Sequence, residues 1–261
     1  MNLRSLISKK IIALFIIIAA PALTLATAGW YITGANNKKN QSSEKLPNKT
    51  IDKASYDINS PSSYSVLVNK GRRLPSAYQP KDLIIPNVPL RSSDTSAEMK
   101  LRAEAARSLE SMFLKASKAG LNLLLVSGHR SYSSQAAIYN RNVKNDGTEK
   151  TDMTSARPGH SEHQTGLAAD IGAKSRTCEL DICFGNTPEG RWLAADAHKY
   201  GFIVRYAEGK SSLTGYDFEP WHLRYVGKDL AGALQAAGKT MEEFFGLPAY
   251  STYAKDPQQL N

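Results

Sequence analysis

Two short stretches of the sequence contain three residues whose side chains commonly bind metal ions. The stretch from Ser155 to Gly172 reads SARPGHSEHQTGLAADIG and contains His163 and Asp170, and His222 follows in FEPWHLRYV. Two imidazole nitrogens and one carboxylate oxygen suit a zinc ion that keeps one position open for water, as catalytic zinc sites do. Each stretch is short enough to arise by chance, so spacing alone leaves a metal site and a chance grouping equally open.

Hydrolysis at such a site also needs a base that takes a proton from water and returns it to the leaving amine. Glu219 stands three residues before His222, and Pro220 between them stiffens the chain. The glutamate can therefore reach the same site without being a ligand.

These motifs together resemble the VanY-type zinc D-alanyl-D-alanine carboxypeptidases. The motif Ser-x-His-x-x-Gly-x-Ala-x-Asp is followed by Glu-Pro-Trp-His, and SGHRSYSSQ at 127–135 supplies a third landmark in the expected order. The resemblance extends from about Tyr64 to Phe245. Its family shares a fold with the D-Ala-D-Ala dipeptidases and with the signalling domain of hedgehog proteins. The first motif is filled by Ser161, His163, Gly166, Ala168 and Asp170.

The resemblance implies a role for each matching residue. His163, Asp170 and His222 would bind one Zn²⁺, and Glu219 would be the catalytic base. Arg130 would stabilise the scissile carbonyl as it becomes an oxyanion, which suits a fixed cation. The substrate's terminal residue would be bound by Gln135, Ser161 and Tyr206. His129 departs from the family, where Tyr or Phe is usual, and this questions the pocket's shape more than its catalysis.

The function implied is removal of the C-terminal D-alanine from peptidoglycan stem peptides. The same zinc and base residues would serve an L,D-carboxypeptidase acting on tetrapeptide stems, or an endopeptidase. A non-catalytic cell-wall-binding module could keep the zinc, but it would need neither Glu219 nor Arg130. Other residues receive ordinary interpretations: His160 as a loop residue, His198 near a helix end, and Glu162 in solvent or orienting its loop.

The N-terminal region, residues 1–32, has the pattern of a signal peptide or signal anchor. Basic residues precede an apolar run from Ile11 to about Ile32, and this run is long enough to span a bilayer. Ala26-Thr27-Ala28 fits a cleavage site, but we favour an uncleaved anchor. The protein is then exported and membrane-anchored facing the cell wall, or secreted if cleavage occurs.

The chain's formal charge of +9 does not indicate a nucleic-acid partner. Three of these charges lie in the first ten residues, and three more lie between Lys38 and Lys53. Residues 33–63 are rich in Asn, Lys and Ser, which predicts a disordered linker. The basic excess therefore belongs mainly to the membrane end and the tether, and residues 64–261 form the predicted enzyme domain.

Cys178 and Cys183 are the only two cysteines of the chain. In an exported protein a local disulfide is the favoured state. A pair of metal-binding thiolates would require two cysteines closer together in the sequence and further cysteines elsewhere. Two free thiols are the remaining alternative.

The predicted elements are mixed without regular alternation, so we expect an α+β fold with a small, mainly antiparallel sheet flanked by helices and preceded by the N-terminal apolar helix. The resemblance places the zinc site on this sheet. The strands are expected at 64–70, 121–128, 202–206 and 221–227, and the helices at 97–119, from Ser133, at 187–201 and at 229–245.

Overall fold

A four-stranded antiparallel sheet positions the residues with the strongest chemical signal. The computed structural model describes residues 51–92 and 97–261. The strands lie in the order β4 (Leu123–Ser127), β5 (Ala168–Ala173), β7 (His222–Tyr225) and β6 (Phe202–Val204). Each adjacent pair is antiparallel. The predicted α+β class with a small, mainly antiparallel sheet is therefore confirmed.

The two faces of this sheet have different roles, because successive side chains of a strand point to opposite sides. Ile171 on β5 and Leu223 on β7 are fully buried in the main hydrophobic core. Asp170 and His222 precede them in the sequence and therefore project from the other face. The sheet thus separates the core from the polar site.

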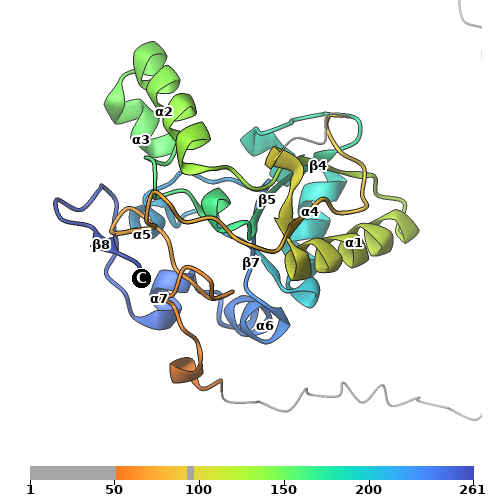
Figure 1. Cartoon of the computed structure of the whole chain (residues 1–261). Helices are drawn as coiled ribbons and strands as arrows, with labels where there is room; N and C mark the ends of the chain where they lie inside the picture. Colours follow the sequence, from red (N-terminus) through yellow and green to blue (C-terminus); the bar gives the residue numbers. More distant parts are fainter. Residues whose placement is uncertain (1–50, 93–96) are drawn as a thin grey trace, which may run out of the picture. The chain divides into compact units, whose positions relative to one another are not determined.

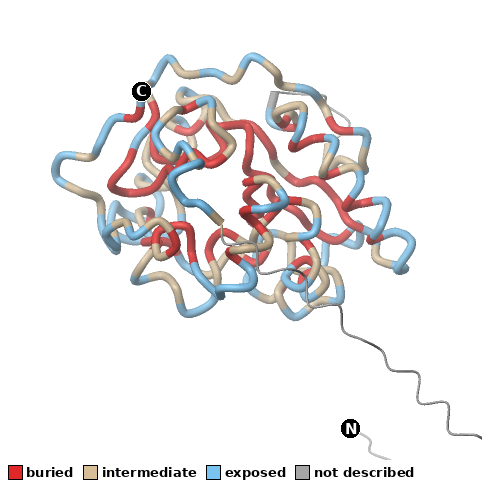
Figure 2. Tube along the Cα trace, turned by 90° about the horizontal axis from the view of Figure 1, so that it is seen from below, coloured by how far each residue is buried: buried red, intermediate tan, exposed pale blue. Residues whose placement is uncertain are grey.

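Helices α1 (Ala103–Lys118) and α4 (Pro188–Asp196) cover the core face of the sheet (Figure 1). The α1 helix contributes a buried stripe that includes Leu109, Met112 and Phe113. The α4 helix begins as predicted, because the Thr187 hydroxyl accepts a hydrogen bond from the Gly190 amide and Pro188 occupies the first turn. Buried chain runs through the centre of the molecule and exposed segments surround it (Figure 2).

The remaining elements surround this framework. Two short strand pairs join distant segments: β1 (Arg72–Arg73) with β8 (Gln258–Gln259), and β2 (Leu83–Ile84) with β3 (Leu101–Arg102). The other helices are α2 (Tyr132–Asp146), α3 (Thr148–Thr154), α5 (Ser211–Thr214), α6 (Lys228–Ala237) and α7 (Met241–Phe245). Short 3₁₀ helices occupy Lys53–Ser55, Ala97–Met99, Glu162–Thr165, Ile182–Asn186 and Ala197–Tyr200.

The first predicted helix begins later than expected. Only Ala103–Lys118 is α-helical within the predicted range 97–119. Leu101 and Arg102 are extended instead, because they pair with β2 and the Arg102 amide donates to the Gly166 carbonyl. The backbone there connects the helix to the site loop.

The strand predicted at 64–70 is wrong, although its apolar residues are buried as a strand's would be. Val66, Leu67 and Val68 are fully buried in an irregular segment. Its carbonyl groups accept hydrogen bonds from arginines rather than from a neighbouring strand: Arg224 donates to Tyr64 and Val66, and Arg72 donates to Leu67. Guanidinium groups therefore satisfy this buried backbone.

The described chain begins before the predicted start of the domain at Tyr64. Within the segment assigned to the linker, Ile51, Tyr56 and Ile58 pack against a second hydrophobic cluster formed mainly by α6 and α7. The predicted N-terminal helix at 1–32 and the first part of the linker lie outside the described residues. Among the helices in the described ranges, none has the length and apolar character needed to cross a bilayer.

Gly166 ends the 3₁₀ helix that carries His163, and replacing it with alanine should destabilise the fold strongly. Its φ is +68°, and an added Cβ would lie 2.8 Å from Leu83 and 3.1 Å from Arg102. Gly209 has a similar φ of +74° with no atom within 4 Å of such a Cβ. We expect Gly209→Ala to lose about 1 kcal/mol from the unfavourable φ, and Gly166→Ala to lose a further ~1–3 kcal/mol from the steric clash.

Urea denaturation of both variants and the parent chain measures these losses. Equal losses for the two variants would show that the contacts of Gly166 are not a packing constraint.

Candidate metal centre and catalytic cleft

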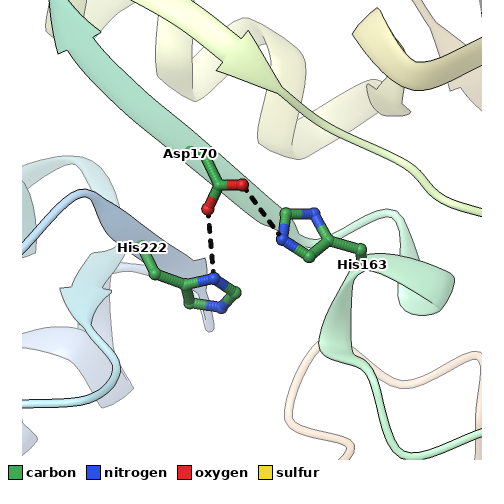
Figure 3. A group of neighbouring side chains, drawn as sticks. All are labelled: His163, Asp170 and His222. Atoms are coloured by element: carbon green, nitrogen blue, oxygen red, sulfur yellow. Dashed lines mark ion pairs between the residues drawn. The ribbon is translucent and has the colours of Figure 1, made fainter. Parts of the chain in front are cut away.

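Two of the predicted metal ligands face each other across neighbouring strands. Asp170 on β5 is paired in register with His222 on β7, which brings side chains on one face within reach of each other. His163 comes from the 3₁₀ helix just before β5. Its ring lies 5.0 Å from that of His222, centroid to centroid. Asp170 lies between the two imidazoles (Figure 3).

The side-chain atoms of this cluster have the arrangement of ligands around an ion. Nε2 of His163 lies 3.3 Å from one carboxylate oxygen of Asp170, and Nδ1 of His222 lies 3.2 Å from the other. All three candidate ligand atoms lie within 4.8 Å of one another. The Oδ1 atom of Asp170 is buried without a hydrogen-bond donor in the described part of the chain. A buried carboxylate that lies between two imidazole nitrogens and has one oxygen without a donor fits a metal cation.

The outward-facing nitrogens of both histidines are also engaged. Nδ1 of His163 donates to the Gly128 carbonyl at 2.6 Å, and Nε2 of His222 donates to the Glu162 carboxylate at 3.4 Å. These contacts leave Nε2 of His163 and Nδ1 of His222 facing the site. Metal-binding histidines in proteins are commonly held by such outer hydrogen bonds.

Glu162 does not lie in solvent, which was one of the two alternatives expected from sequence. It is 1% exposed, and its carboxylate is bound by two buried arginines, Arg205 and Arg224. Burial alone would raise the pKa of Glu162, but the two guanidinium groups hold it well below its usual range. The glutamate is therefore ionised and forms part of the site's support.

The local charge favours a cation. Burial acts to lower the pKa of His222, but Asp170 and Glu162 outweigh it and raise this pKa to about 9. Burial acts to raise the pKa of Asp170, but the nearby imidazoles of His163 and His222 hold this pKa below its usual range. In the absence of a metal, the carboxylates thus stabilise positive charge on the imidazole, as they would on an ion.

Glu219 reaches the same site from the turn that precedes β7. The His222 amide donates to the Glu219 carbonyl, which closes a tight turn over Pro220 and Trp221. The carboxylate lies 3.7 Å from Nδ1 of His222. Burial raises the pKa of Glu219 to about 8, while the charge on His222 opposes this shift. A carboxylate with a pKa near neutrality is suited to accepting and returning a proton.

Arg130 enters the site from the chain that follows β4. Its amide donates to the His163 carbonyl, which ties this segment to the ligand loop. Its guanidinium donates to Gln135 at 3.0 Å and to Ser127 at 3.1 Å. Nε of Arg130 is buried without a partner among the described residues. The guanidinium of Arg130 is therefore held in a fixed orientation, and its Nε–H donor stays available.

All eight predicted site residues line one cleft of about 410 Å³, a volume typical of small-ligand sites. Ser161 is buried in its lining. The Tyr206 ring packs against His222, with ring centroids 4.9 Å apart. Gln135 uses its carbonyl oxygen on Arg130 and its amide nitrogen on the Ala156 carbonyl. In this structure, Gln135 thus orients Arg130.

The cleft also contains residues that the sequence interpretation did not single out. Cys178 and Cys183 form the predicted disulfide, and the loop that it closes places Leu180 and Ile182 in the lining of the cleft. These two apolar side chains are 41% and 61% exposed. Their exposure in a cysteine-closed loop could have been suspected from the sequence, but their position beside the metal cluster could not.

His160 lies outside the cleft lining. Nδ1 of its ring is paired with the Asn69 carbonyl, and the hydrogen bonds described for it include no residue of the cleft.

The sheet, the three convergent candidate ligands and the adjacent, largely buried Glu219 define a candidate metallohydrolase centre. Residues 98–228 match the family model described as VanY, D-alanyl-D-alanine carboxypeptidase. The chain belongs to this carboxypeptidase family.

Three similar proteins illustrate the range of the family. Putative carboxypeptidase YodJ of Bacillus subtilis is 45% identical over 188 residues, which cover 72% of this chain and 69% of the relative. The structure of the LdcB LD-carboxypeptidase, described as revealing the basis of peptidoglycan recognition, is 42% identical, with a TM-score of 0.69 over 77% of this chain and 89% of that one. The vancomycin resistance D,D-pentapeptidase VanY in complex with Zn(II), solved as a variant, is 30% identical, with a TM-score of 0.57 over 69% and 97% of the two chains.

His129, beside Arg130, should make the fold sensitive to acid. It is 3% exposed, and neither ring nitrogen has a partner among the described residues. Burial, assisted by His163 and Lys100, lowers the pKa of His129 to about 4. The unfolded chain, with a histidine pKa of about 6.5, therefore takes up this proton first as the pH falls.

We expect the parent chain to lose on the order of 1 kcal/mol more stability than His129→Phe between about pH 7 and pH 5. Urea denaturation with a chelator present, at both pH values, measures this difference without a contribution from bound metal. Parallel losses in the two proteins would show that His129 is not protonated on unfolding in this range.

Proposed function

We propose that this chain is a zinc-dependent carboxypeptidase that removes the C-terminal D-alanine from peptidoglycan stem peptides. The observation that carries the proposal is the position of Glu219, whose largely buried carboxylate lies 3.7 Å from Nδ1 of His222, beside the three convergent candidate ligand atoms. A site that served only structure would need neither this acid nor Arg130 in the same cleft. The zinc complex of the similar VanY protein supports the choice of ion.

The roles of the residues follow from their positions. A zinc ion held by His163, Asp170 and His222 would supply a Lewis acid that polarises the peptide carbonyl and would favour ionised Glu219. The Glu219 carboxylate then accepts a proton from the attacking water and passes it to the departing amine. Arg130 directs its guanidinium to the carbonyl oxygen as negative charge develops there.

Two bonds are candidates for cleavage, and both release D-alanine. The motifs shared with the D-alanyl-D-alanine carboxypeptidase family favour the D,D bond of pentapeptide stems. The L,D bond of tetrapeptide stems is the second candidate, because similarity to the LdcB LD-carboxypeptidase is higher than to the D,D-pentapeptidase VanY: 42% against 30% identity, with TM-scores of 0.69 and 0.57. On similarity alone, the L,D bond is the better supported of the two.

We further propose that the enzyme works outside the cytoplasm, tethered to the membrane by its N-terminal segment or secreted after cleavage. The disulfide between Cys178 and Cys183 supports an oxidising compartment. The peptidoglycan substrate proposed for the cleft is also an extracellular polymer. The N-terminal segment itself lies outside the described residues.

Digestion of defined stem peptides tests the bond. The full chain is incubated with tripeptide, tetrapeptide and pentapeptide muropeptides, with chelator or with added zinc, and the products are measured by mass spectrometry. We expect loss of one alanine, abolished by the chelator and restored by zinc. Loss from the pentapeptide alone indicates D,D cleavage, and loss from the tetrapeptide alone indicates L,D cleavage. No cleavage of any stem by the zinc-loaded chain would contradict the proposal.

Replacement of Glu219 tests the base. Glu219→Gln preserves the shape of the side chain but cannot accept the proton, so kcat/KM should fall by about 10²–10⁴-fold or more while zinc stays bound. The matched control is Glu208→Gln, an exposed glutamate outside the cleft, which should keep full activity. Metal content and peptide turnover are measured on the same samples. Full activity in Glu219→Gln would exclude a general-base role.

A further inference from the structure

A buried cluster of four charged side chains lies behind the metal site. Glu162, Arg205, Arg224 and Glu242 are each at most 2% exposed. Arg205 bridges the two glutamates, with a contact of 2.8 Å to Glu162 and one of 2.6 Å to Glu242. Burial of four charges is costly unless each one has partners, so the cluster requires an explanation.

The two carboxylate oxygens of Glu162 have different partners. Oε1 accepts from Nε of Arg205 at 2.8 Å and from Arg224 at 2.7 Å. Oε2 lies 3.4 Å from Nε2 of His222. The two guanidinium groups therefore fix the rotation of the carboxylate so that its second oxygen faces the imidazole.

The two nitrogens of His222 thus face opposite sets of carboxylates. Nε2 faces Glu162, while Nδ1 lies 3.2 Å from Asp170 and 3.7 Å from Glu219. An imidazole that donates its Nε2 proton to an ionised acceptor keeps a lone pair on Nδ1, which is the form that binds a metal.

We propose that Glu162 is a positioning residue that holds His222 in the Nε2-protonated tautomer, with Nδ1 directed to the metal. This inference rests on the zinc site proposed above. Glu162 is not one of the three candidate ligands, and its described hydrogen bonds go to Arg205, Arg224 and His222. The arginines act one step further back, because they hold Glu162 in the orientation that accepts the histidine proton.

The rival explanation is an ion cluster that only stabilises the fold, and Glu242 provides the control for it. Glu242, on α7, binds the same Arg205 through two contacts of 3.0 and 2.6 Å and accepts from Asn69 at 3.1 Å. None of the contacts described for Glu242 reaches a predicted ligand. Glu162→Gln and Glu242→Gln therefore both remove one buried charge next to Arg205, but only the first alters a partner of His222.

The amide of Glu162→Gln places an NH₂ donor either against the arginines or against the histidine N–H, so one set of contacts must be lost. Zinc affinity of the full chain, measured with zinc alone by competition with a chelator, should fall by about 10–100-fold in Glu162→Gln. Glu242→Gln should lose stability in urea but keep nearly the parent affinity. Equal loss of affinity in both variants, or none in Glu162→Gln, would overturn the proposal.

A measurement on the unaltered chain keeps the test independent of whether either variant folds. Nitrogen-15 NMR of histidine-labelled, zinc-loaded protein distinguishes the protonated from the metal-bound nitrogen of each ring. We expect His222 to carry its proton on Nε2 and zinc on Nδ1, and the reverse assignment would refute the positioning role. Both experiments use zinc without peptide. Their results therefore test the role of Glu162 even if the protein does not cleave stem peptides.

Discussion

The register between β5 and β7 is the constraint on which the site depends. Asp170 lies opposite His222, and the pairing continues through Ala169 with Leu223. Because side chains alternate between faces, a slip of one residue would turn one ligand into the hydrophobic core and bring an apolar residue to the site. Burial of Leu223 and its neighbours therefore maintains the register, and the register in turn brings the candidate ligands together.

The polar face requires a second kind of support, because it buries charged groups. A histidine or carboxylate removed from water is unstable unless it has partners. Here His163 is held by the Gly128 carbonyl, and Glu162 is held by two arginines. The same Arg224 also binds the carbonyls of Tyr64 and Val66, so the segment before β1 is fixed by the chemistry that supports the site.

The sequence predicted those features that depend on local pattern or on a recognisable motif. The strand before Gly128 and the capped helix after Thr187 fall into this group, as does the convergence of His163, Asp170 and His222 in one cluster. Glu162 and the segment 64–70 show where such prediction fails. Nothing near Glu162 in sequence reveals its burial, because its partners Arg205 and Arg224 lie about forty and sixty positions away. The apolar run 64–70 was predicted as a strand because sequence shows burial but not which groups satisfy the buried backbone.

The environment also gives the two acidic residues of the cleft different proton affinities. Asp170 and Glu219 both lie near Nδ1 of His222, yet their pKa values are shifted in opposite directions. Contacts with both imidazoles keep Asp170 ionised, which a metal ligand requires. Glu219 is largely buried, its removal from water outweighs the opposing charge of His222, and its pKa rises to about 8. Two carboxyl groups with divergent proton affinities are the usual mark of distinct roles in one active site. The surroundings thus suit Asp170 to the proposed role of ligand and Glu219 to the proposed role of base, although the two side chains share the same functional group.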